Sequence, residues 1–233
     1  PMDLEFRDEN GEWVTLGSYF DGDRPVILTL NYYKCPMLCG LQLNGMVDGL
    51  EMMEWTPGEE FDIVTVSINP LETPELARAK KQNYLKRLDR PAAAGGWHFM
   101  TGRELEINRL AETVGFSYTY DPVSKEYAHA AAIMICTPDG RVARYLYGIE
   151  YPAKRLKFGL LEAAEGSIGT TLDQLILYCY HYDPTNRRYT PVAMNIMRVG
   201  GGATALILGI ALGGMWFREW RRKNKKDSKE MTA

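Results

Sequence analysis

Two cysteines separated by three residues offer the strongest chemistry in this sequence. Cys35 and Cys39 follow an apolar run at 26–31 and precede an apolar-periodic segment that begins at Leu41, with Pro36 between them. At this spacing both thiols would lie on one face of the first turn of a helix. A helix N-terminus stabilises negative charge and therefore lowers a thiol pKa. Two such thiolates can either close a disulfide or bind a soft metal ion.

The segments around these cysteines must position them, and their pattern predicts a buried strand, a tight loop and the start of a helix. Further along the chain, strand-like and helix-like segments alternate. Strands are expected at 25–31, 61–69, 97–100 and 116–120, and helices from after Cys39 to about Glu54 and at 74–89, 102–114 and 152–165.

A hairpin closes this alternation. Residues 129–147 are interpreted as a strand, a Pro-Asp-Gly turn and a second strand, which predicts an antiparallel pair. A lead-in at 1–24 is expected to contribute a short strand and a turn. Strands that alternate with helices and end on a hairpin predict an α/β sandwich of thioredoxin-like type.

Length and charge narrow the class of protein. The 233 residues suit one domain of ordinary size with appendages, and the hydrophobic fraction of 45% is typical of a globular chain. Nothing in a net charge of -3 suggests a nucleic-acid-binding protein, and four cysteines are too few for a disulfide scaffold. Because the sequence starts at Pro1, a preceding signal peptide is left open.

Four blocks of sequence, in this order, resemble the Sco/SenC family, the thioredoxin-fold copper proteins of cytochrome oxidase assembly. The resemblance covers roughly residues 4–166. The blocks are the lead-in at 4–30, the Tyr-x-x-Cys-Pro-x-x-Cys block that ends at Cys39, the segment Ser-Ile-Asn-Pro-Leu-Glu-Thr-Pro-Glu at 67–75, and His129-x-Ala-x-Ile followed by Pro138-Asp139-Gly140.

The resemblance implies that Cys35, Cys39 and His129 bind copper. Two thiolates and one imidazole form a soft site of low coordination number, which suits Cu(I) and also accepts Cu(II). The same donors would accept zinc, but not magnesium or calcium. His129 is far from the cysteines in sequence, so only the fold can bring it near them. Taken alone, a histidine ahead of an apolar strand is more often packed than metal-bound.

One position departs from the family pattern. Family members usually carry an acidic residue where this chain has Asn69. If that carboxylate recruits a partner or tunes the site, its charge is lost here. Metal binding through the three ligands need not suffer.

Other side chains with metal or redox chemistry have simpler interpretations. Cys136 lies within an apolar strand and is expected to be a buried, inert thiol. The methionines in the helix after Cys39 are expected to fill gaps in the core rather than to form a copper-binding stripe. His98, between Trp97 and Phe99, is expected to have a structural role.

Cys179 and His181 form a more ambiguous pair. They lie in the segment 171–191, which begins as an amphipathic helix and ends as an aromatic loop. The pair could be an auxiliary metal site that faces the first one. The tyrosines around it equally suit packing at a membrane interface, so both interpretations stay open.

The uncharged stretch at 199–217 predicts a single transmembrane helix, because a bilayer core needs about 20 apolar residues. Gly209 and Gly213 form a GxxxG pattern that suits packing on a transmembrane partner, although a lone anchor is the simpler interpretation. Basic residues crowd the tail at 218–233. The positive-inside tendency places this tail in the cytoplasm and the domain before the helix on the periplasmic face of an inner membrane.

The expected organisation therefore has four parts. They are a thioredoxin-like copper-binding domain at 1–166, a connector with a short helix and an aromatic loop at 167–198, a transmembrane helix at 199–217, and a basic cytoplasmic tail at 218–233.

The predicted function is that of a membrane-anchored copper metallochaperone that loads or prepares the binuclear copper centre of a cytochrome c oxidase subunit. Outside the cytoplasm, Cys35 and Cys39 tend to oxidise, and a disulfide cannot bind copper in this way, so a dithiol reductant is an expected partner. One alternative is a thiol–disulfide oxidoreductase that reduces the cysteines of the oxidase copper site. Another is a resident accessory subunit of a respiratory membrane complex.

Overall fold

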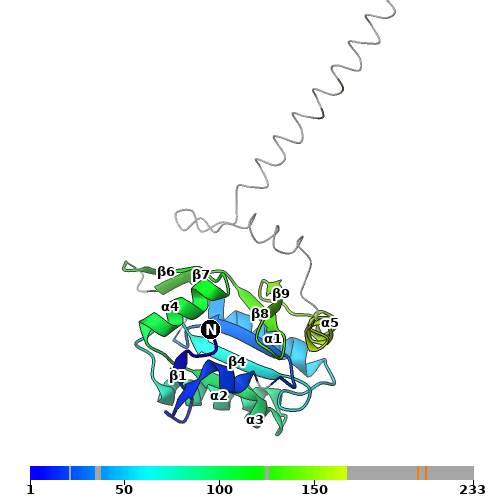
Figure 1. The fold of residues 1–233 in the computed structure, drawn as a ribbon, viewed down its shortest axis with the longest axis horizontal. Coiled ribbons are helices and arrows are strands. Elements are labelled where there is room, and N and C mark those ends of the chain that lie inside the picture. The colour runs from blue at the N-terminus through cyan, green and yellow to red at the C-terminus, as the bar shows by residue number, and fades with distance from the viewer. Residues whose placement is uncertain (21, 35–37, 124–125, 167–203, 205–207, 209–233) are drawn as a thin grey trace, which may run out of the picture. The chain divides into compact units, whose positions relative to one another are not determined.

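The computed structural model describes residues 1–20, 22–34, 38–123, 126–166, 204 and 208, with the backbone alone at 38 and 39. The chain divides into two units, Pro1–Gln174 and Leu175–Ala233. The described part of the first unit carries the fold (Figure 1). Within the described residues, no helix combines the length and the apolar character needed to cross a bilayer. The predicted transmembrane helix lies outside the described residues except at 204 and 208, and the predicted domain boundaries stay predictions.

A five-stranded mixed sheet forms the centre of the first unit. Its central strand is β3 (Val26–Asn31), which pairs in parallel with β4 (Asp62–Ser67) and antiparallel with β8 (Ala132–Cys136). The edges are β5 (Trp97–Met100), parallel to β4, and β9 (Val142–Tyr147), antiparallel to β8. All six residues of β3 are buried, because both faces of the sheet are covered.

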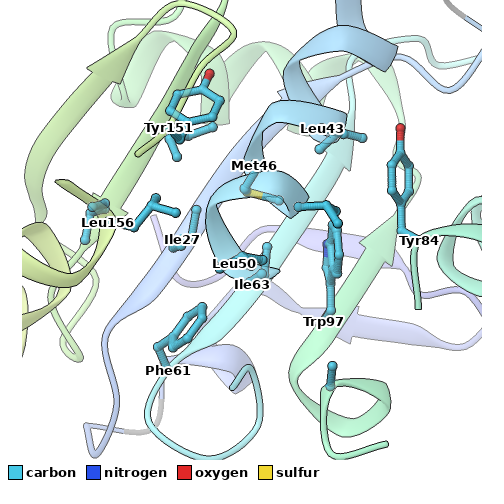
Figure 2. Packing of buried hydrophobic residues seen from close by; sticks show 14 of the residues in the cluster. Ile27, Leu43, Met46, Leu50, Phe61, Ile63, Tyr84, Trp97, Tyr151 and Leu156 are labelled. Carbon is cyan, nitrogen blue, oxygen red and sulfur yellow. The ribbon is translucent and has the colours of Figure 1, made fainter. Parts of the chain in front are cut away.

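One face of the sheet is covered by α1 (Leu38–Glu51), α2 (Pro74–Leu88) and α5 (Ala153–Ala164). In Figure 2, Met46 and Leu50 of α1 lie over Ile27 of β3, and Leu156 of α5 continues the same layer. Apolar residues at helical spacing on α1 form this layer, so the helix is held by burial of one face.

The opposite face is covered by α4 (Glu104–Thr113) and by the N-terminal lead-in. The lead-in folds as a hairpin of β1 (Glu5–Arg7) and β2 (Trp13–Thr15), followed by the short helix η1 (Leu16–Tyr19). A one-turn helix, α3 (Ala93–Gly96), precedes β5 and was not predicted, because its Gly-Gly sequence has poor helix propensity.

A second hairpin stands apart from the main sheet. It joins β6 (Tyr118–Asp121) to β7 (Glu126–His129) in antiparallel register, with Tyr118 opposite His129. The sequence analysis placed His129 at the start of the strand that runs to Cys136, and this is wrong. That strand, β8, begins at Ala132, and His129 ends β7. The two alanines between them, which continue into Ala132, carry no periodicity that could mark the boundary.

The predicted α/β sandwich of thioredoxin-like type is otherwise confirmed. Parallel strands alternate with helices up to β5, and the antiparallel pair of β8 and β9 ends the sheet. This arrangement puts the carboxyl end of β3 and the start of α1 on either side of the cysteine loop, which is the local arrangement that the sequence predicted.

Candidate metal centre

The fold brings His129 next to the end of the central strand. The residue is 4% exposed, and its imidazole packs against the rings of Phe116 and Tyr32, with centroids 5.6 Å and 6.3 Å away. Tyr32 directly follows β3 and lies three positions before Cys35. The histidine is therefore beside the segment that leads into the cysteine loop, as a site shared by these residues requires.

A hydrogen bond fixes which nitrogen of His129 can bind a metal. Nδ1 lies 3.0 Å from the carbonyl oxygen of Ala130. A carbonyl can only accept a hydrogen bond, so Nδ1 carries the proton and the lone pair of the neutral ring is on Nε2. A backbone carbonyl that holds the second ring nitrogen is typical of metal-binding histidines.

Aromatic rings pack the β6–β7 hairpin, which carries His129, against the residue that follows β3. Tyr127 contacts Tyr32 at a centroid distance of 5.4 Å, and it contacts Tyr118 and Tyr120 of β6 at 5.8 Å and 5.1 Å. Burial raises the pKa of Tyr127, and the neighbouring Tyr120 adds to the shift. The hairpin is thus packed onto the residue that follows β3, and it carries His129 with it.

A buried carboxylate holds the entry to the cysteine loop. Glu72 is 6% exposed and accepts three hydrogen bonds. Its Oε2 accepts from the backbone N–H of Tyr33 at 2.7 Å and from the hydroxyl of Ser67 at 2.6 Å, and its Oε1 accepts from the N–H of Lys34 at 2.8 Å. The last two residues before Cys35 are therefore fixed from a different part of the chain.

Asn69 shapes the turn that delivers Glu72. Its side-chain oxygen accepts from the N–H of Leu71 at 3.0 Å, and its carbonyl accepts from the N–H of Glu72 at 3.1 Å. An aspartate could accept the same side-chain bond. The departure from the family pattern at this position thus keeps the turn and removes only a charge.

Cys39 is the second residue of α1, so its backbone lies on the first turn, where the positive end of the helix dipole acts. Its side chain and all of Cys35 lie outside the described residues, and their shared face stays a prediction. Among the side chains that the structure describes, no three of His, Cys, Asp or Glu gather as a metal site.

The simpler interpretations of three other kinds of side chain hold, with one exception. Cys136 is 1% exposed, and burial raises its pKa to about 12, which makes it the inert thiol that was predicted. Met46 and Met53 are buried in the core as predicted, whereas Met52 is 82% exposed and fills no gap. His98 packs on Tyr19 at a ring centroid distance of 4.5 Å, and burial, followed by the charge of Lys81, lowers its pKa. Cys179 and His181 lie outside the described residues.

The family comparison identifies the chain. The model of the SCO1/SenC family matches residues 2–158. The chain belongs to this family. No curated protein matches the sequence of this SCO1/SenC protein.

Solved structures show the same fold as this SCO1/SenC protein. A protein from Aquifex aeolicus VF5 has a TM-score of 0.63 at 20% identity, over 74% of this chain and 95% of that one. The Bradyrhizobium japonicum ScoI structure with copper bound has a TM-score of 0.52 at 21% identity, over 70% of this chain and 96% of that one. BsSco is described as a member of the Sco family of cytochrome c oxidase assembly proteins with a disulfide switch. Its structure has a TM-score of 0.51 at 21% identity, over 69% of this chain and 91% of that one.

Sequence reasoning identified the three candidate ligands but missed the role of Glu72. The residue lies in one of the blocks that carried the resemblance, yet nothing local reveals that its carboxylate reaches the backbone of Tyr33 and Lys34. A buried polar contact between distant segments leaves no periodic pattern in a single sequence.

Proposed function

We propose that this SCO1/SenC protein binds copper through Cys35, Cys39 and His129 and loads or prepares the binuclear copper centre of a cytochrome c oxidase subunit. The observation that carries the proposal is the placement of His129, whose ring is buried beside the entry to the cysteine loop with its lone pair on Nε2. Sco proteins of the same fold hold copper or act in oxidase assembly.

The donor set suits this cargo. Two thiolates and an imidazole favour a soft, low-coordinate ion, and Cu(I) fits such ligands. Two features hold the candidate ligand segments in place before copper binds. The Glu72 carboxylate fixes the entry to the cysteine loop, and the β6–β7 hairpin fixes His129. A preordered set of donors loses less entropy when it binds the ion.

The proposed location is an inner membrane, with the domain on the periplasmic face and the basic tail in the cytoplasm. The uncharged stretch at 199–217 and the Lys/Arg-rich residues after it support this orientation. In that compartment the thiols tend to oxidise, so a dithiol reductant is the second proposed partner beside the copper-receiving oxidase subunit.

The deciding experiment measures copper in the reduced full-length chain. We expect one copper per chain and, in the Cu(II) form, a thiolate-to-copper charge-transfer band. Cys35→Ala and Cys39→Ala should abolish binding, and His129→Ala should weaken it about tenfold or more without unfolding the domain. The matched control is His98→Ala, a histidine outside the candidate site. Unchanged copper stoichiometry in all three ligand variants would refute the proposal.

A thiol–disulfide oxidoreductase is the second candidate, and the disulfide switch described for BsSco favours keeping it. The same preparation separates the two functions. Absence of copper binding together with ready disulfide exchange by Cys35 and Cys39 would support the oxidoreductase. Tight copper binding that depends on His129 would support the metallochaperone.

A further inference from the structure

Gln42 is a fully buried polar side chain near the start of α1. Its Oε1 accepts a hydrogen bond from Nδ2 of Asn31 at 3.1 Å, and its Nε2 donates to the carbonyl oxygen of Ala132 at 2.8 Å. Asn31 is also fully buried and ends β3, and Ala132 begins β8. One side chain thus joins a helix to two neighbouring strands.

The orientation of this network is fixed by chemistry. A carbonyl only accepts, so Gln42 must present its amide nitrogen to Ala132 and its oxygen to Asn31. Asn31 must then present its nitrogen to Gln42. The remaining atom, Oδ1 of Asn31, is buried and has no hydrogen-bond partner among the described residues. A buried acceptor without a partner costs stability, so apolar side chains here would stabilise the core more.

The network connects the segments that carry the candidate ligands. Gln42 lies three positions after Cys39, about one turn further along α1. Ala132 lies three positions after His129. The two residues between them are also fixed: Ala130 through its carbonyl bond to the His129 ring, and Ala131 through a bond from the N–H of Gly148 at 2.9 Å.

We propose that Gln42 is a positioning residue for the copper site. It sets the separation between the first turn of α1, which carries Cys39, and the segment that carries His129. A movement of the first turns of α1 away from the start of β8 would then break a buried hydrogen bond. The inference rests on the proposed copper function, but the geometry that it assigns exists in the metal-free protein.

The test compares two buried polar deletions in the full-length chain. Gln42→Met keeps the length of the side chain and removes its hydrogen bonds to Asn31 and Ala132, together with its hydrogen bond to the Tyr151 side chain. The control is Thr29→Val. Thr29 lies in β3, the strand that Asn31 ends, and the substitution removes the buried hydrogen bond that it donates to the Thr65 hydroxyl of β4 (3.0 Å). Gln42→Met loses more than one buried hydrogen bond of the core and Thr29→Val loses one, so a merely structural role would lower the stability of both variants and leave the copper Kd unchanged.

The decisive measurement is the copper Kd in two backgrounds. Gln42→Met should raise Kd about tenfold while His129 is present, the usual size of a defect behind a metal ligand. In the His129→Ala background it should change Kd less than about twofold, because there is no longer a histidine to position. Thr29→Val should leave Kd unchanged in both. Equal losses in the two backgrounds, or no loss in either, would overturn the inference.

A second readout needs no metal. In the reduced, metal-free protein, Gln42→Met should move the NMR signals of the His129 ring, whereas Thr29→Val should not. If wild-type copper binding does not depend on His129, the proposed function fails and the ring signals still decide the positioning role. His129 ring signals that do not change in Gln42→Met would overturn the positioning role of Gln42.

Discussion

At the scale of single residues, buried polar side chains hold the segments that carry the candidate copper ligands. Glu72 is the main example, because each of its oxygens accepts from the backbone just before Cys35. Hydrogen bonds of this kind compensate a buried carboxylate for the water that it loses on folding. The loop entry is thus ordered by these hydrogen bonds together with the burial of the Tyr32 and Tyr33 rings.

Replacing Glu72 by glutamine tests this role. Glu72→Gln puts an amide NH₂ where an oxygen now meets a backbone N–H, so one buried donor loses its acceptor. The unfolding free energy should fall by about 1–3 kcal/mol in urea titrations. Glu75→Gln, at an exposed position in the first turn of α2, is the control and should change it by less than about 0.5 kcal/mol. Equal effects of the two substitutions would contradict the assigned contacts.

Cys136 gives a pH-dependent prediction. Its pKa rises from 9.0 to about 12 on folding, because burial disfavours the thiolate. The stabilisation linked to this thiol is complete below pH 9 and is lost as the pH rises toward 12, since only the unfolded chain then ionises. Denaturant titrations should give the unfolding free energy of the wild type and of Cys136→Ala at each pH. Above pH 9, the wild type should lose roughly 1.4 kcal/mol per pH unit relative to Cys136→Ala. A difference between the two proteins that is constant with pH would rule out the buried thiol.

Among the elements, α1 decides the site because it carries Cys39 and Gln42. It lies unusually close to the chain between β9 and α5. A Cβ on Gly45 would stand 1.8 Å from the carbonyl oxygen of Ile149, and one on Gly49 would stand 2.0 Å from that of Tyr151. Two glycines one turn apart therefore let the helix approach a backbone that any side chain would push away.

This close approach predicts opposite effects for two glycines of the same helix. Alanine normally stabilises a helix interior by about 1 kcal/mol over glycine. Gly40 has open space around it, so Gly40→Ala should be neutral or stabilising. Gly45→Ala should destabilise by about 1–3 kcal/mol, since backbone has to move. Thermal unfolding of the two variants gives the comparison, and similar midpoints would disprove the packing.

At the scale of the whole molecule, the described hydrophobic core lies entirely between Leu4 and Ala163. Its two halves cover the two faces of one sheet, and both are complete before α5 ends. The core contacts that the structure describes are therefore all made by residues between Leu4 and Ala163.

Truncation separates the fold from the proposed anchor. A fragment of residues 1–166 should unfold cooperatively and stay in the aqueous phase of a detergent partition. The full chain should enter the detergent phase through 199–217. A fragment without a cooperative transition would show that the domain needs the later residues.

A copper chaperone would co-purify with the oxidase only transiently, whereas a fixed stoichiometry would identify a resident subunit.

The sequence by itself determined the local framework of the site. The buried strand, the cysteine loop and the helix of α1 follow from hydrophobic runs and periodicity, which depend on neighbours in the chain. The buried fate of Cys136 followed from the same apolar pattern. The four family blocks, in order, added the candidate ligands.

Only the tertiary structure decided how those parts meet. The short strand β7 that ends at His129 pairs with β6 and packs through tyrosines, and neither contact has a local signal. The hydrogen bonds of Glu72 to the loop entry and of Gln42 to Ala132 join segments far apart in sequence. Such polar contacts depend on the distance between folded elements, and no periodicity in the chain encodes that distance.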